Sequence, residues 1–580
     1  MTLAAIEPAK PILFVEFRFL WIFAIIFGVN WLLRSNTARK VWLLVCSHVF
    51  YGCFFIGNPS EFFPNLFAGK WGDLPPGWWF PSLLWFSTIM DYYVGLGIED
   101  AKTDRRRKQW VAASLLVNLG VLGFFKYYGF FDQNVRAVVA WLGLTPSWEP
   151  LKVFLPYGIS FYTFQSLSYS LEVYRKKLPA ERSFLNLAFF IAFFPQVVAG
   201  PIVRAMTFLP QTLKKVEWSS VDVRGCLALF LIGFVKKACI GDTLSQVSDP
   251  YFASPETHSA YSAWAASLAY AGQIYCDFSG YSDMAIAVSR LLGYELCVNF
   301  AFPYFSNSIT EFWRRWHMSL SSWLRDYLYI SLGGNRGSKL FTYRNLMLTM
   351  VLGGLWHGAA WTYVVWGAMH GFALIVHREW ARMTAAAAGI GKVMNVIAVP
   401  LTFFWVLLTW IPFRANDIYT DKPNATDKGA KLLSRSSAGF QSLDKDDSEK
   451  PMAYPFAKTD DKKTVALLAH DAKTNTWTGT GADGKPATIH LHQSGFALTA
   501  KVWESLVFFK DHAKRNVCGN FIWVILGGLT IVHWLNSRGL LAKWWRVIPD
   551  WLFSLLLGGG WALALHWKVV AYKQFIYFQF

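Results

Sequence analysis

Charged residues are scarce in this sequence: they make up 16% of its 580 residues, and only 37 are Asp or Glu against 55 Lys and Arg. A soluble protein of this length would carry more charge and far fewer aromatic residues than the 30 Trp and 49 Phe found here. The mean hydropathy of +0.29 is correspondingly high. This composition argues against a soluble globular enzyme and predicts an integral membrane protein.

Cysteine is also rare, with seven residues scattered mostly within apolar segments. No C-x-x-C pair and no Cys/His spacing of the kind that binds zinc is present. We therefore expect neither a disulfide framework nor a metal site, and we interpret these cysteines as small buried apolar residues.

Long apolar runs recur along almost the whole chain and can cross about 30 Å of hydrocarbon, or a good part of it. They predict an all-α, polytopic membrane fold with about 11–13 transmembrane or re-entrant helices. The first run is too long for the apolar part of a secretory signal, so we expect it to remain as a membrane anchor. The clearest runs are Pro11–Leu33, Val41–Ile56, Trp78–Ile98, Trp110–Phe131, Ala188–Ala199, Cys226–Ile240, Val393–Ile411, Phe521–Leu535 and Trp551–Leu565.

The net charge is +18, and basic residues cluster in short connections between apolar runs. Short loops rich in Lys and Arg tend to stay on the cytoplasmic side, where they also meet anionic lipid head groups. We therefore expect membrane lipid, and no nucleic acid, as the partner of these charges. The basic connections are Lys102–Lys108, Arg175–Lys177, Lys214–Lys215, Lys236–Lys237 and Arg538–Arg546.

One polar region interrupts the membrane pattern, from about residue 415 to residue 500. It divides the chain into a predicted membrane core (1–414), a polar extramembrane insertion (415–500), and C-terminal membrane helices with an aromatic tail (501–580). Short strands are predicted at Thr464–His470 and Ala487–Leu491. Its histidines lack a Cys partner and metal-site spacing, so we interpret them as surface residues.

The middle of the chain carries several motifs in a characteristic order, and together they resemble the membrane-bound O-acyltransferase (MBOAT) superfamily. The similarity is closest to the bacterial branch typified by the membrane component of alginate O-acetylation. It runs from about residue 150 to residue 414 and resumes in the last spans, whereas the insertion departs from the usual compact length. The motifs are Leu155–Gln165, Phe194–Ile202, Asp277–Ile286, the stretch Ile309–His317 and Leu355-Trp356-His357-Gly358.

The resemblance implies a catalytic role for His357, the histidine of the Leu-Trp-His-Gly motif. Ionisable groups at membrane depth are costly and are usually retained for a site. A neutral imidazole can take a proton from a hydroxyl and return it to a leaving thiol. His317 occupies the second polar position of the family pattern and could orient the donor, tune His357 or stabilise an oxyanion. Without the resemblance, either histidine could be a structural residue bonded to the backbone.

Arg314, Arg315 and Arg325 are candidates for binding the phosphates of an acyl donor. They could equally pair with Glu311 and Asp326. A helix over Glu311–Arg325 would place Glu311 one turn from Arg315, and Trp313 one turn from His317.

Asp277 and Asp283 lie in an otherwise apolar stretch, with Gly280 between them. This pattern is typical of a broken or re-entrant segment that lines a polar cavity, so both are cavity-lining candidates. A similar break is predicted at Gly200-Pro201.

The last six residues, Phe575–Phe580, form an aromatic tail beside the final span. Composition alone predicts an interfacial anchor. In polysaccharide-acylating members of the family, similar tails are thought to reach the active site, which would make Tyr577 a transient acyl carrier activated by His357.

The resemblance implies an O-acetyltransferase of the bacterial inner membrane that acts on an exported or cell-envelope polysaccharide. It would use acetyl-CoA or another acyl thioester as donor and bind no cofactor. The chain lacks a convincing Gly-x-Ser-x-Gly elbow, so we expect a separate SGNH-type acyltransferase as extracytoplasmic partner. Three alternatives stay open: peptidoglycan O-acetylation, D-alanyl transfer to teichoic acid, and a transporter or flippase. A transporter would be expected to show internal repeats, and none is evident.

Overall fold

The protein is described by a computed structural model. The chain folds into two compact units, each built from three separate segments that alternate along the sequence. The first unit comprises Met1–Phe234, Ser279–Ala301 and Trp316–Ser331, and the second Val235–Phe278, Phe302–Arg315 and Leu332–Phe580. The structure describes residues 13–55, 64–68, 70, 74–75, 77–151, 153–253, 255, 258–384, 391–415, 434–436, 439–441, 456–458, 464–471, 476–481, 486–490, 495–512, 516–518, 521–540 and 547–569.

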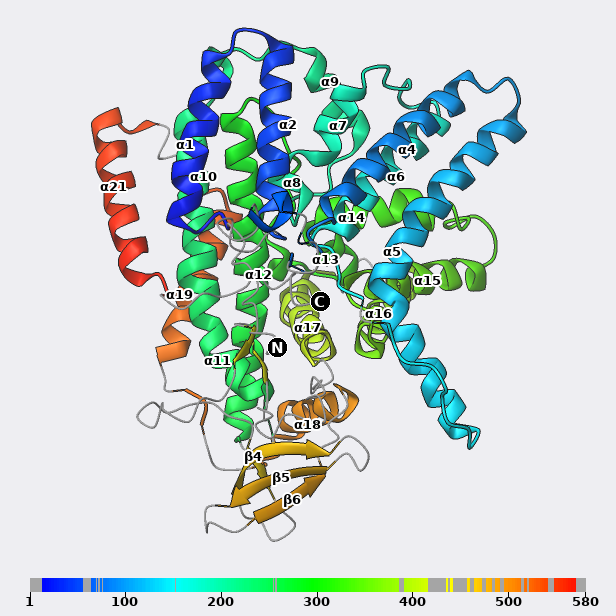
Figure 1. Ribbon diagram of the computed structural model, residues 1–580. Helices are drawn as coiled ribbons and strands as arrows, with labels where there is room; N and C mark the ends of the chain where they lie inside the picture. The colour runs from blue at the N-terminus through cyan, green and yellow to red at the C-terminus, as the bar shows by residue number, and fades with distance from the viewer. Residues whose placement is uncertain are drawn as a thin grey trace. The chain divides into compact units, whose positions relative to one another are not determined.

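The first unit is helical in its described part (Figure 1). Its elements are α1 (Phe17–Leu32), α2 (Asn36–Gly52), α4 (Pro81–Asp100), α5 (Asp104–Trp141), α6 (Ile159–Tyr174), α7 (Phe184–Ala192), α8 (Phe194–Val197), α9 (Ala205–Leu213), the 3-10 turn η2 (Trp218–Ser220), α10 (Val223–Phe234), the end of α12 (Ala260–Leu291), α14 (Met318–Trp323) and the π-helix η6 (Leu324–Tyr329).

Short polar residues mark where α2 and α5 begin. The hydroxyl of Ser35 accepts a hydrogen bond from the backbone N–H of Ala38 at 3.4 Å, and Thr103 accepts one from Arg106 at 3.3 Å. Each hydroxyl satisfies a backbone donor that the first turn of a helix leaves without a partner. These two helices therefore start at polar breaks between apolar runs.

A buried carboxylate joins three helices of the first unit. Asp91 of α4 is fully buried, and it accepts hydrogen bonds from Ser114 at 2.7 Å, Asn118 at 2.9 Å and Ser170 at 2.9 Å. The first two donors lie on α5 and the third on α6. Because a buried polar group is costly unless it is hydrogen-bonded, this network favours one alignment of the three helices.

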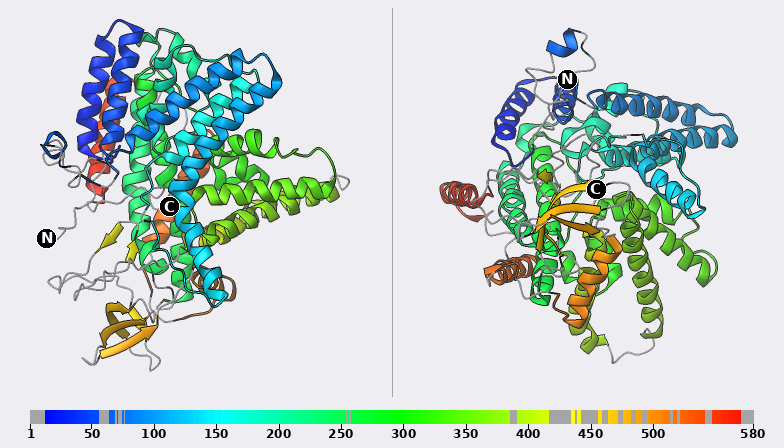
Figure 2. Two further views of the ribbon diagram at one scale, coloured as in Figure 1. Left: turned by 45° about the vertical axis from the view of Figure 1, so that its right-hand side comes forward. Right: turned by 60° about the horizontal axis from the view of Figure 1, so that its bottom comes forward.

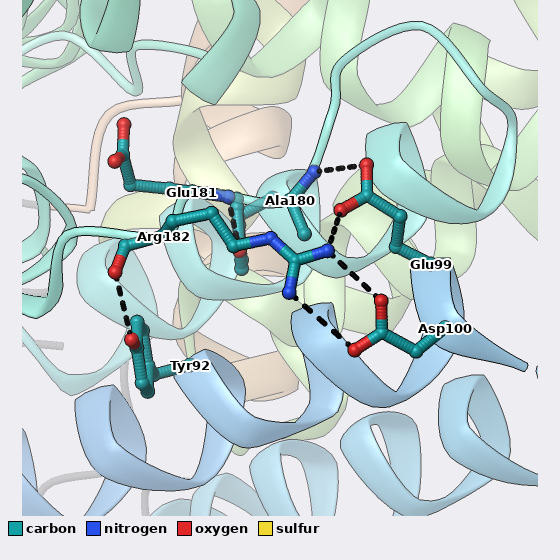
Figure 3. Close-up of polar contacts among 7 residues, drawn as sticks. Tyr92, Glu99, Asp100, Ala180, Glu181 and Arg182 are labelled. Carbon is teal, nitrogen blue, oxygen red and sulfur yellow. Dashed lines mark hydrogen bonds and ion pairs between the residues drawn. The ribbon is translucent and has the colours of Figure 1, made fainter.

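The connection between α6 and α7 is fastened to the end of α4 by Arg182 (Figure 3). Its guanidinium pairs with Glu99 at 2.7 Å and with Asp100 at 2.9 Å, and its carbonyl oxygen accepts a hydrogen bond from Tyr92 at 2.8 Å. Glu99 also accepts from the backbone N–H of Ala180 at 3.1 Å. The charge of Arg182 is thus compensated by two carboxylates.

The second unit contains helices and a small group of strands (Figure 1). Its helices are the π-helix η3 (Val235–Gly241), α11 (Asp242–Ala253), the first part of α12, the 3-10 turn η5 (Pro303–Phe305), α13 (Ile309–Arg315), α15 (Lys339–His357), α16 (Trp361–Thr384), α17 (Gly391–Arg414), α18 (Gly495–Phe508), α19 (Phe521–Ser537) and α21 (Asp550–Trp567).

The strands of the described residues fall within the polar insertion. Four of them form an antiparallel sheet in the order β3 (Phe456–Lys458), β4 (Thr464–Asp471), β5 (Thr476–Gly481) and β6 (Pro486–His490). A separate hairpin pairs β1 (Ser434–Ser436) with β2 (Gly439–Gln441). The two strands predicted from the sequence are confirmed as β4 and β6. Outside the insertion, the described chain is helical, as the apolar runs predict.

Large apolar side chains stand on the surface of several helices. Trp21 and Leu32 of α1 are 74% and 80% exposed, and Leu116 of α5 is 77% exposed. Soluble proteins rarely expose contiguous apolar surface, whereas lipid-facing helices do so as a rule. By length and composition, Asp104–Trp141 and Ile397–Arg414 could each cross a membrane, and Phe17–Leu32 and Phe521–Ser537 are shorter apolar helices.

The predicted break at Gly280 is wrong, because α12 runs without interruption through Asp277, Gly280 and Asp283. A Cβ atom placed on Gly233 of α10 would lie 2.6 Å from the carbonyl oxygen of Gly280. Gly233 therefore lets α10 approach the backbone of α12 closely. Helix α12 continues through Gly280 despite the low helix propensity of glycine. The break predicted at Gly200-Pro201 is confirmed, since α8 ends at Val197 and α9 begins at Ala205.

Candidate active site

His357 is the last residue of α15, within the second unit. Helix α15 packs along α16, and Figure 2 shows the two from further directions. A Cβ atom on Gly354 would lie 2.2 Å from the carbonyl oxygen of Tyr363, and one on Gly367 would lie 2.3 Å from that of Met350. The helices therefore meet backbone to backbone, which fixes the position of His357 at the end of the contact.

Aromatic rings surround the imidazole of His357, which is only 4% exposed. The ring centroids of Trp356, Trp366 and Phe413 lie 5.0, 5.2 and 5.3 Å from that of His357, each in edge-to-face geometry. Such a setting excludes most water and restrains the ring. A base held in this way can act on a hydroxyl without competition from solvent.

A further histidine, His370 of α16, lies beside this aromatic group and was not predicted. It is fully buried, and its Nδ1 accepts a hydrogen bond from the indole N–H of Trp313 at 3.3 Å. Its ring centroid lies 4.8 Å from that of Trp366, which also contacts His357. Because Nδ1 is an acceptor, the neutral ring carries its proton on Nε2. The sequence offered only a weak signal for His370, which is its position one helical turn after Trp366.

His317 belongs to the first unit and is fully buried. Its backbone has φ 42° and ψ 55°, the left-handed region that side chains other than glycine rarely adopt. Asn299 holds the turn that follows, because its carbonyl oxygen accepts from Met318 N–H at 2.9 Å and its side chain accepts from Ser319 N–H at 3.3 Å. Strain of this kind often marks a functional position.

The helix predicted over Glu311–Arg325 is wrong, because this turn interrupts it. The chain forms α13, then the left-handed turn at His317, then α14, so Trp313 and His317 are not one helical turn apart. Glu311 and Arg315 do pair across one turn of α13, at 2.5 Å.

The ion-pair alternative for the three candidate arginines is observed for two of them. Arg315 pairs with Glu311, and Arg325 pairs with Asp326 at 2.7 Å. Arg314 is exposed on α13. These ion pairs still allow the arginines to bind the phosphates of an acyl donor, because an arginine has five N–H groups that can donate hydrogen bonds.

Asp277 lies in a buried charge cluster with Lys237. The Lys237 ammonium is 2.6 Å from the Asp277 carboxylate and 2.7 Å from that of Asp242, and all three side chains are largely buried. Buried charges persist when they are paired in this way. Asp283 lies farther along α12 and is half-buried. Tyr577 and the rest of the aromatic tail lie outside the described residues.

Comparison with known proteins agrees with the motifs. The model of the membrane-bound O-acyltransferase family matches residues 77–412. The chain is 42% identical over 403 residues to a probable alginate O-acetylase of Pseudomonas aeruginosa, covering 69% of this chain and 71% of that one. It is 36% identical over 364 residues to a peptidoglycan O-acetyltransferase of Helicobacter pylori, covering 58% and 67%.

A more distant relative is a teichoic acid D-alanyltransferase of Streptococcus thermophilus, which is 28% identical over 291 residues, or 46% of this chain and 70% of that one. The family model spans more than half of the chain, and it includes both candidate histidines. The chain therefore belongs to the membrane-bound O-acyltransferase family and is an O-acyltransferase.

Proposed function

We propose that this enzyme transfers acetyl groups from a thioester donor to the hydroxyls of an exported or cell-envelope polysaccharide. The observation that carries the proposal is His357, a buried histidine held among aromatic rings at the end of α15. The donor is acetyl-CoA or another acyl thioester, and three relatives that support the proposal are named as probable alginate O-acetylases.

In the proposed reaction, His357 acts as the general base. It takes the proton of the attacking hydroxyl as the new C–O bond forms, and it returns that proton to the sulfur as the C–S bond breaks. His317 orients the donor or stabilises the oxyanion of the tetrahedral intermediate. Arg314, Arg315 and Arg325 are proposed contacts of the acyl donor, and Asp277 and Asp283 are proposed to line a polar cavity.

The proposal extends to the membrane. Residues 1–414 form the membrane-embedded core, 415–500 an extramembrane module, and 501–580 the C-terminal helices, giving a multi-pass protein of the bacterial inner membrane with about 11–13 crossings. Tyr577 carries the acetyl group outward, and an SGNH-type acyltransferase completes the transfer to the polymer. This route carries the acetyl group from a donor made inside the cell to an acceptor outside it.

The test uses membranes that contain the full chain, incubated with labelled acetyl-CoA and followed by peptide mass spectrometry. The wild type is expected to acquire label on its C-terminal peptide and to acetylate the polymer, and His357→Ala is expected to lose both. His48→Ala is the control, because His48 stacks on Trp85 in the first unit, with ring centroids 4.8 Å apart. Normal acetylation by His357→Ala would contradict the proposed mechanism.

The shuttle is tested separately with Tyr577→Phe, which keeps the ring and removes the nucleophilic oxygen. We expect this variant to lose transfer to the polymer. If it acetylates normally, the tail is an anchor and the acetyl group passes directly to the acceptor or partner.

Peptidoglycan is a second candidate acceptor, favoured by the similarity to the Helicobacter pylori enzyme. Separating labelled peptidoglycan from labelled soluble polysaccharide after the same incubation decides between the two acceptors.

A further inference from the structure

Three arginines from separate segments of the first unit converge on Tyr327 and Asp326 of the π-helix η6. Arg175 follows α6, Arg204 precedes α9, and Arg325 lies beside Asp326 in η6. The guanidinium carbons of Arg175 and Arg204 lie 5.1 and 5.3 Å from the centroid of the Tyr327 ring. The ring thus holds both cations in place through cation–π contacts.

The anions within this group are fully engaged. The Asp326 carboxylate pairs with Arg204 at 2.5 Å and with Arg325 at 2.7 Å. Burial acts to raise the pKa of the Asp326 carboxyl, but hydrogen bonds from Arg325 and Arg204 outweigh it and lower the pKa. The nearby Glu172 accepts from the Tyr327 hydroxyl, and also from the backbone N–H of Met206 at 2.8 Å.

This group of side chains carries more positive than negative charge. Arg175 donates to the backbone oxygen of Asp326 at 2.9 Å and to the Ser331 hydroxyl at 3.0 Å. Among the residues that the structure describes, no carboxylate forms an ion pair with Arg175. Three guanidiniums thus face two carboxylates. Arg175 and Arg325 each donate two hydrogen bonds within this group, which uses only part of their five N–H donors.

The group is also open to a ligand. The Arg325 side chain is 63% exposed and that of Arg204 is 20% exposed. Arginine is suited to phosphate because its planar fork donates two parallel N–H bonds. A cluster in which guanidiniums are positioned by a tyrosine and a carboxylate, with donors still available, is preorganised for an anion.

We infer that Arg175, Arg204 and Arg325 form a phosphate-binding site that holds the phosphopantetheine end of the thioester donor. The inference rests on the proposed function for the identity of the donor. The segment Arg175–Lys177 is one of the short basic connections that the charge pattern assigns to the cytoplasm, where thioester donors are made. The same phosphate chemistry occurs in coenzyme A, in a carrier protein and in anionic lipid, and the test separates these sources.

The test measures binding to the purified full-length protein in nanodiscs of phosphatidylcholine. The probes are coenzyme A, 4′-phosphopantetheine and pantetheine, which share the thiol arm but differ in phosphate. The variants are Arg175→Gln and Arg325→Gln. The control is Arg182→Gln, an arginine of the same connection whose charge is compensated by Glu99 and Asp100 (Figure 3).

We expect both phosphate-bearing probes to bind more tightly than pantetheine. Losing one charge-assisted hydrogen-bonding group should weaken their binding by about tenfold in each variant. Pantetheine binding should not change in any variant, and Arg182→Gln should match the wild type with every probe. Arg325 is largely exposed, so its variant decides the question if Arg175→Gln does not fold.

Equal binding by the wild type and both variants of coenzyme A, and also of a phosphopantetheinylated carrier protein, would overturn the site. A phosphopantetheinylated carrier protein that loses affinity in the variants, while free coenzyme A binds no better than pantetheine, would support the site with the carrier as donor. If the variants lose only bound phosphatidylglycerol, measured by native mass spectrometry in nanodiscs that contain it, the arginines hold lipid and the inference is wrong.

Failure of the site differs from failure of the proposed function. Wild-type membranes that acetylate polymer, together with variants of unchanged KM for the donor, would remove the site and leave the function. Conversely, phosphate-dependent binding that the variants lose, in a protein that transfers no acetyl group, would retain the site and remove the function.

Discussion

Replacing Gly367 with alanine should separate α15 from α16 and destabilise the protein. On helix propensity alone, alanine is favoured over glycine by about 1 kcal/mol. The new Cβ would lie 2.3 Å from the Met350 carbonyl oxygen and 2.9 Å from the Val351 Cα, and both atoms belong to the backbone. No side-chain rotation can relieve these contacts, so one helix has to move.

Overpacking of this kind costs about 1–3 kcal/mol, and contacts with backbone atoms place Gly367 at the upper end. After the gain in propensity, we expect a net loss of about 1–2 kcal/mol. Movement of α16 also displaces Trp366, whose ring packs against His357. Acetyl transfer should therefore fall more than the loss of folded protein explains.

Gly558→Ala is the matched control, because Gly558 lies in α21 and, in the described part of the chain, no atom other than its neighbours and its own helix backbone lies within 4 Å of the added Cβ. It should be neutral or slightly stabilising. The assay is the apparent melting temperature of detergent-solubilised protein, followed by size exclusion after heating, together with transfer rates in membranes. If Gly367→Ala melts at or above the wild type and keeps full activity, the backbone contact does not restrain these helices.

Two further substitutions probe buried groups of the second unit. Lys237→Met leaves the carboxylates of Asp242 and Asp277 buried without their cation, and we expect the free energy of unfolding to fall by about 3–5 kcal/mol. The measurement is the amount of folded protein in membranes, which should be small. Wild-type amounts would show that water or another group compensates the two carboxylates. His370→Phe keeps an aromatic ring but leaves the Trp313 indole N–H without its acceptor. The melting temperature should therefore fall in line with a loss of about 1–3 kcal/mol, and acyl transfer should slow. Unchanged melting and transfer would mean that this hydrogen bond contributes nothing.

Helix positions were predictable because a lipid-spanning helix needs a long apolar run, and that length can be read directly. The runs near Phe17, Val393 and Phe521 coincide with α1, α17 and α19. The run Ala188–Ala199 was predicted as one segment, yet it is divided between α7 and α8. A proline shortly after a helix favours such a division, but apolar content does not reveal it.

Partners of the site residues were not predictable, because they depend on contacts between distant parts of the chain. Lys237 was assigned to a basic connection, and the sequence gives no sign that it pairs with Asp277, forty positions away. His370 carries no motif, so only the shared contact with Trp366 connects it to His357. Local spacing did succeed where the contact is local, as for Glu311 and Arg315.

The left-handed backbone of His317 changes how substitutions at this position should be interpreted. An alanine there would lose the imidazole and keep the unfavourable φ of 42°, which costs about 1–2 kcal/mol for a residue with a Cβ atom. A glycine would lose the imidazole and relieve that cost. Comparing the two variants separates what the ring contributes to acyl transfer from what the turn contributes to folding, a distinction that alanine scanning alone would miss.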